Sequence, residues 1–153
     1  MAIVSAICNS FKQEILVEGH NFTNGTDAFK LALFTEDATL SKSTTAYTAP
    51  ADGTADPTNT KEVSSTSTGY TTGGNALTST TPVLSGDTAC CKFADTSFTS
   101  ASFTANGCLI YNDTNADRAV CTIAFGSDKT VTSGTFTIQF PTADASNAII
   151  RIA

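Results

Sequence analysis

The stretch Gly134-Thr135-Phe136-Thr137-Ile138-Gln139-Phe140-Pro141 alternates strictly between polar and apolar side chains. Successive side chains of an extended strand point to opposite faces, so the two phenylalanines and the isoleucine share one face while the threonines and the glutamine share the other. A strand with one buried and one solvated face is typical of antiparallel sheets. The proline lacks a backbone N–H and ends the run.

Similar short runs of strand-forming residues extend outward from this stretch and are separated by turn signals. They cover approximately residues 28–35, 76–83, 88–94, 97–104, 108–111, 119–125 and 148–153. Phe98 and Phe103 have opposite parity, which predicts a bulge between them, and Asn106-Gly107 predicts a turn. The last run is apolar on both sides except for Arg151, so we expect it to lie centrally or to be covered by another subunit. About eight strands without alternating helices predict one mainly β domain over residues 1–153, an antiparallel, jelly-roll-like β-sandwich.

The N-terminal segment has a different period. Val4, Ile7, Phe11 and Ile15 recur every three to four residues, which predicts one short amphipathic helix over residues 3–17. Gly19 is placed to end it. Between the first strand and the remaining ones, residues 36–61 are polar and contain turn formers, so we expect a long loop there. Loops of that length in compact domains are often functional.

Composition excludes several classes of protein. Only 14% of the 153 residues are charged, the formal net charge is −6, and the eight lysines and arginines are scattered. Nucleic acids and anionic membranes require clustered positive charge, so neither is an expected partner. No apolar run is long enough to span a membrane. The segment Met1–Cys8 lacks the basic start of a secretory signal, so we expect no export and a protein made in a cytoplasm.

Sites with recognisable chemistry are not expected. The five cysteines form no CxxC pair, which predicts reduced thiols and no zinc site. His20 is expected to be exposed to solvent or to lie in a turn, because no nucleophile elbow accompanies it. Asp113, Asn115 and Asp117 have the spacing of calcium ligands, but Arg118 and Ala124 stand where an EF-hand requires Gly and Glu. We therefore expect no enzyme activity, no metal and no cofactor.

Whole segments resemble a family of small virion proteins of tailed bacteriophages. The resemblance covers most of the chain, except for a loop at residues 46–61 that is longer here. The segments that carry it are residues 8–16, 29–35, 69–74, 109–113, 124–129, 134–141 and 147–152. The resemblance implies a phage structural protein, similar to the capsid cement (decoration) proteins. Such proteins bind the outer surface of the head, commonly as trimers, and clamp neighbouring capsomers.

From this resemblance we expect a homotrimer whose partners are the major capsid protein and copies of itself. The expected location is the outer surface of the virion head, after synthesis in the cytoplasm of the host bacterium. The candidate adhesive elements are the N-terminal segment, the 36–61 loop and the C-terminal strand. A tail, baseplate or fibre component is the alternative, and a hydrolase that acts on the host envelope is the enzyme alternative.

Overall fold

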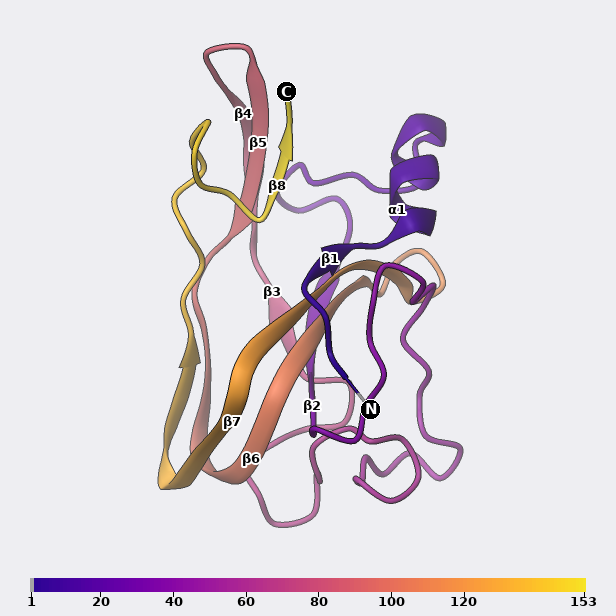
Figure 1. Ribbon diagram of the computed structural model, residues 1–153, viewed down its shortest axis with the longest axis vertical. Coiled ribbons are helices and arrows are strands. Elements are labelled where there is room, and N and C mark those ends of the chain that lie inside the picture. Colours follow the sequence, from indigo (N-terminus) through magenta and orange to yellow (C-terminus); the bar gives the residue numbers. More distant parts are fainter. Residues whose placement is uncertain (1) are drawn as a thin grey trace.

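The computed structural model describes residues 2–153 and has the predicted mainly β fold (Figure 1). Its elements are β1 (Ala6–Ile7), α1 (Asn9–Glu14), a 3₁₀ turn (Ile15–Val17), β2 (Phe29–Phe34), β3 (Asn75–Leu77), β4 (Ser79–Ser85), β5 (Thr88–Phe93), β6 (Thr96–Asn112), β7 (Arg118–Ile138) and β8 (Ile150–Ile152). A five-stranded sheet has the order β1-β7-β6-β2-β3, and a three-stranded sheet has the order β4-β5-β8. Neighbouring strands in both sheets are antiparallel, which confirms the predicted sandwich-like architecture.

A long β-ribbon made by β6 and β7 dominates the molecule. The prediction of four short strands was wrong here, because residues 97–104 and 108–111 belong to β6 while residues 119–125 and 134–138 belong to β7. Asn106-Gly107 forms no turn; it lies at a register shift within the ribbon. The bulge predicted between Phe98 and Phe103 is present as two register shifts. Figure 1 shows the consequence: the ribbon descends from the centre, bends sharply, and its other arm runs back up.

The N-terminal helix is shorter than predicted. It covers Asn9–Glu14 instead of residues 3–17, because the preceding residues pair with other parts of the fold. Ile3 forms a bridge with Leu40, and β1 pairs with β7. Residues 3–7 thus form backbone pairs with distant segments, and this tertiary pairing overrides the helical spacing of their side chains.

The last predicted strand is shorter and lies at an edge. Of residues 148–153, only Ile150–Ile152 are strand, and they form the edge strand β8 beside β5. Ile150 is buried in the core, while Ile152 is 54% exposed. The predicted strand 76–83 is divided at Thr78, because β3 joins the large sheet and β4 joins the small one. Among the described residues, no helix has the length and apolar character of a membrane span.

The core lies between the two sheets and is rich in aromatic rings. Phe22 and Phe29 stack with their centroids 4.5 Å apart, and Phe93 packs against both rings. Phe98, Phe103 and Phe136 continue the aromatic packing into the bent arm of the ribbon. Aromatic side chains bury large areas, so they hold together two sheets that have no strand in common.

Gly74 marks a close approach of two backbone segments that tolerates no side chain. Its φ is +79°, and a Cβ atom there would lie 1.7 Å from the carbonyl oxygen of Leu31. Gly53 has a similar φ of +75° but has open space around it. We expect Gly74→Ala to prevent native folding, whereas Gly53→Ala loses about 1 kcal/mol from backbone strain alone. Urea unfolding followed by circular dichroism measures both, and equal losses would contradict the steric explanation.

Candidate functional site

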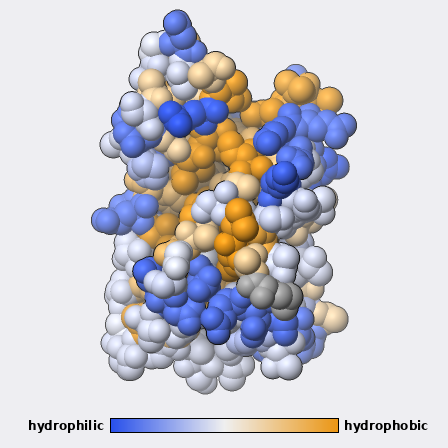
Figure 2. All heavy atoms as spheres, in the orientation of Figure 1, coloured by the Kyte–Doolittle hydropathy of each residue, from blue (hydrophilic) through white to orange (hydrophobic). Residues whose placement is uncertain are grey.

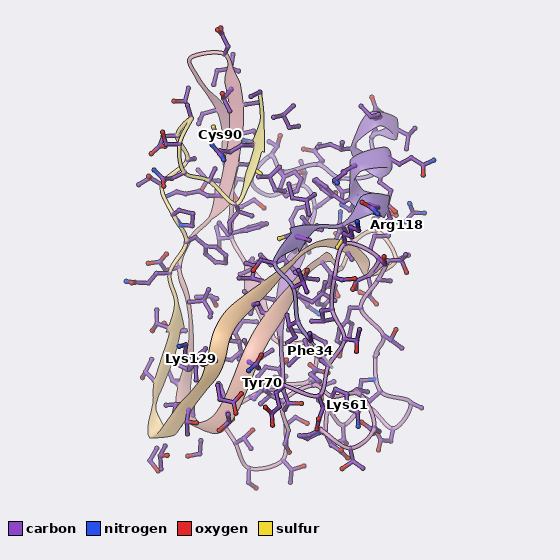
Figure 3. The ribbon with its side chains drawn as sticks, viewed as in Figure 1. Phe34, Lys61, Tyr70, Cys90, Arg118 and Lys129 are labelled. Carbon is purple, nitrogen blue, oxygen red and sulfur yellow. The ribbon has the colours of Figure 1, made fainter. Side chains whose placement is uncertain are left out.

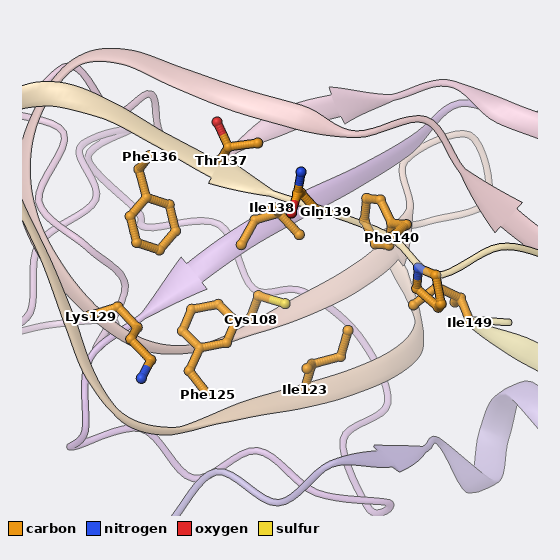
Figure 4. Close-up of a pocket in the computed structure, with 11 residues that line it drawn as sticks. Cys108, Ile123, Phe125, Lys129, Phe136, Thr137, Ile138, Gln139, Phe140 and Ile149 are labelled. Atoms are coloured by element: carbon orange, nitrogen blue, oxygen red, sulfur yellow. The ribbon is translucent and has the colours of Figure 1, made fainter. Parts of the chain in front are cut away.

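An open apolar groove lies inside the bend of the β6–β7 ribbon (Figure 4). Its volume is about 530 Å³. Both arms of β7 contribute, and the side chains that line it are mostly half-buried. The apolar lining consists of Cys108, Ile123, Phe125, Phe136, Ile138, Phe140, Pro141 and Ile149. Figure 2 shows hydrophobic side chains gathered in a hollow in the middle of this face of the molecule.

The alternating sequence of β7 and its backbone bends build this groove. On the second arm of β7, Phe136 and Ile138 point to one face, and on the first arm Phe125 points toward them. Gly126 and Ser133 have positive φ values of 78° and 47° and lie on either side of the bend. The bend brings the ring centroids of Phe125 and Phe136 to 6.2 Å from each other. Two apolar rows that are distant in sequence therefore face one another across the groove.

The groove has one charged residue in its lining. Lys129 lies at one end, and its Nζ donates a hydrogen bond of 3.0 Å to Ser127 Oγ. Lys129 belongs to β7, and β1 pairs with this strand only at Cys121 and Thr122. The outer edge of β7 beyond these residues has no strand partner within residues 2–153. An apolar groove beside a free strand edge is suited to binding an extended segment of protein.

His20 lies in the interior, so the prediction of a solvent-exposed histidine was wrong. Its side chain is fully buried, and Nε2 donates a hydrogen bond of 2.8 Å to the Glu14 carboxylate. Nδ1 accepts a hydrogen bond from the amide of Asn112, 3.1 Å away. Arg118, which lies close to α1 in Figure 3, forms a second ion pair with Glu14, at 3.2 Å. The group fastens α1 to the sheet, and both ring nitrogens of His20 are already engaged.

The Asp113–Asp117 loop uses its polar side chains to hold the turn between β6 and β7. Asp113 pairs with Lys30 at 2.9 Å, and the amide of Asn115 donates to the carbonyl of Gly19 at 2.6 Å. Burial and then the nearby Asp113 charge raise the pKa of Asp117. Among the described residues, no group of three or more His, Cys, Asp and Glu side chains is arranged to hold a metal ion.

A second polar cluster, which sequence reasoning missed, surrounds Glu62. The side chain is fully buried, and its carboxylate accepts three hydrogen bonds. The donors are the hydroxyls of Tyr47 and Tyr70, at 2.9 and 2.6 Å, and the backbone N–H of Gly73, at 2.7 Å. Tyr111 stacks on Tyr47 and donates to the Gly73 carbonyl. All three tyrosines of the chain thus gather around one carboxylate, a feature that no local spacing signals.

The Glu62 cluster fastens the long loop to the large sheet. Tyr47 belongs to the predicted 36–61 loop, and Tyr70 also accepts a hydrogen bond from the backbone N–H of Leu33 in β2. Tyr47 and Ala55 are buried. This part of the loop therefore has a structural role in the fold, and its adhesive role stays a prediction. Burial raises the pKa of Glu62, an effect that outweighs its three hydrogen bonds.

The raised pKa of Glu62 predicts a pH-dependent stability with a defined sign. As pH rises above 4.5, the unfolded state releases the proton first, so the folded state is progressively destabilised up to the raised pKa. We expect Glu62→Gln to remove this fall in the free energy of unfolding. The fall amounts to about 1.4 kcal/mol for each unit by which the pKa is raised. Thermal unfolding from pH 4.5 to 8 measures it, with the exposed Glu36→Gln as control. If the unfolding temperatures of Glu62→Gln and of the unchanged protein vary with pH in parallel, this assignment is contradicted.

The buried thiols predict slow modification of the native protein. All five cysteines are free and buried. Burial raises the pKa of Cys8 to about 11 and those of Cys91 and Cys108 to about 12. Because the thiolate is the reactive form, we expect alkylation at pH 8 to be at least about a hundredfold slower than in denaturant. Mass spectrometry after timed labelling checks this; one thiol that reacts at the denatured rate would contradict it.

The chain was compared with protein-family models, curated proteins and solved structures, and none of the three comparisons finds a match. The possible function of the site is therefore inferred from the geometry of its residues. The features left unsatisfied within the chain are an open apolar groove and a strand edge, while the polar clusters are internally satisfied.

Proposed function

We propose that this chain is a structural protein of a tailed-phage virion, a capsid cement protein that binds the outer surface of the head as a homotrimer. The observation that carries the proposal is the open apolar groove beside the free edge of β7, which is a surface suited to protein contacts. The similarity of sequence segments to small virion proteins supports the phage assignment. The polar clusters at His20 and Glu62 are buried and fully engaged, so they serve the fold.

Charge supports the outer surface of the head. The chain has a formal net charge of −6, and its lysines and arginines do not gather into a patch in the sequence. A packaged genome is strongly negative, so a protein of this charge is repelled from the inner side of the shell. On the outside, the same charge keeps unbound copies soluble during assembly.

Multivalent binding explains how a small domain stabilises a large capsid shell. A single chain of this size offers limited contact area, and a groove contact alone gives modest affinity. Three linked copies that engage neighbouring capsomers convert the second and third contacts into intramolecular steps, which raises the overall affinity by about 10² to 10⁴. The clamp then resists the separation of capsomers when internal pressure rises.

Binding to capsids tests the proposal directly. Purified protein is mixed with expanded capsids that lack it, and bound copies are counted by quantitative gel and located by electron microscopy. We expect saturable binding of hundreds of copies at local three-fold positions and a higher rupture temperature of the shell. A handful of copies, all at the tail vertex, would contradict the cement role and favour the tail, baseplate or fibre component.

A further inference from the structure

The free edge of β7 differs from the edges formed by β1, β3, β4 and β8, which are protected against pairing. β1 and β3 are very short, and β8 is a short strand that carries Arg151. In β4, Pro82 and a register shift between Thr80 and Val83 interrupt the edge before residues 83–85, which remain extended. Short strands, charges, prolines and bulges are the usual means of preventing edge-to-edge association. The β7 edge from residue 130 to residue 138 has neither charge nor proline, so it is open to a partner.

The β4–β5 hairpin protrudes from the molecule and exposes large apolar side chains of β4 near its tip. Among the described residues, Leu84 is 76% exposed and Val83 is 46% exposed, although both are large hydrophobic side chains. Ser85 pairs with Thr88, so Gly86 and the exposed Asp87 form the two-residue tip. Figure 1 shows this tip projecting at the opposite end of the molecule from the bend of the ribbon. The hairpin of one copy is therefore presented outward, toward other molecules.

We propose that the β4–β5 hairpin of a second copy of this chain inserts Leu84 into the apolar groove and pairs Asp87 with Lys129. The chemistry is complementary: the groove is apolar with a lysine at one end, and the hairpin is apolar with an acidic tip. Asp128, the acidic neighbour of Lys129, already accepts a hydrogen bond from the Asn106 amide at 2.8 Å. Lys129 thus remains the charge that faces the incoming hairpin.

The shape of the hairpin distinguishes it from the more strongly exposed apolar end of the N-terminal helix. Leu16 and Val17 are 84% and 70% exposed at the end of the N-terminal helix, and Glu18 follows them. Their backbone is helical and cannot pair with a strand edge, whereas residues 83–85 are extended. A narrow groove that runs beside an unpaired strand favours the extended segment.

The proposed contact joins two different surfaces, so it has a direction. Head-to-tail contacts of this kind form closed rings when the rotation between copies closes. A ring of three copies is the assembly expected of the proposed cement protein. The inference rests on that proposed function for the number of subunits, while the contact itself rests on the groove and the hairpin.

Self-association of the full chain tests the contact. Sedimentation equilibrium over a range of concentrations gives the association constant of the unchanged protein and of the variants. We expect Leu84→Gln to weaken association at least about tenfold, as for a central apolar contact. Lys129→Asp and Asp87→Lys should each weaken it about fivefold, and the double exchange in one chain should restore it. Leu16→Gln, an equally exposed apolar residue, is the matched control and should leave association unchanged.

The outcomes separate this inference from the proposed function. Thermal unfolding first confirms that each variant is folded, since all the exchanged side chains are exposed. A protein that is monomeric at every concentration, or a double exchange that restores nothing, overturns the hairpin contact even when capsid binding is saturable. Conversely, a restored double exchange in a protein that does not bind capsids supports the contact and contradicts the cement role.

Discussion

The buried carboxylate of Glu62 is the interaction on which the arrangement of the large sheet depends. It collects donors from the 36–61 loop, from residues 70–73 and, through Tyr70, from β2. A buried charge without partners is strongly destabilising, so the surrounding segments are constrained to the positions that provide them. Gly74, directly after the cluster, lies against the Leu31 carbonyl where no side chain fits. Together they lock a long irregular segment onto β2, and the loop becomes part of the domain.

A second constraint comes from the ribbon. β6 and β7 are long, and the other strands of the large sheet pair with only part of each. The rest of the ribbon is two-stranded. A two-stranded ribbon is marginal unless its apolar face packs against something. The bend at Gly126 and Ser133 satisfies this requirement in part, because Phe103, Phe125 and Phe136 pack together. The half-buried remainder of that face is the groove, so the candidate site is a direct consequence of how the ribbon is stabilised.

The two polar clusters and the groove have opposite roles. The clusters at Glu62 and at His20 satisfy their hydrogen bonds internally, so they stabilise one conformation and offer nothing to a partner. The groove and the β4–β5 hairpin leave apolar side chains and a strand edge unsatisfied, and burying them against another molecule is favourable. A rigid domain that exposes a few apolar surfaces and a strand edge is expected of a protein whose role is to form interfaces in an assembly.

The sequence by itself determined the β-rich class, the position of most strands, the presence of one N-terminal helix and the bulge between Phe98 and Phe103. These depend on alternation and parity, which are local properties of extended chains. Only the tertiary structure decided that α1 begins at Asn9, that Asn106-Gly107 lies within a strand, and that His20 and Glu62 are buried. β1 pairs with β7 at Cys121 and Thr122, and the hydrogen-bond partners of each buried polar group come from segments far apart in the chain. Such pairings are long-range and outweigh local preference, so no short stretch of sequence specifies them.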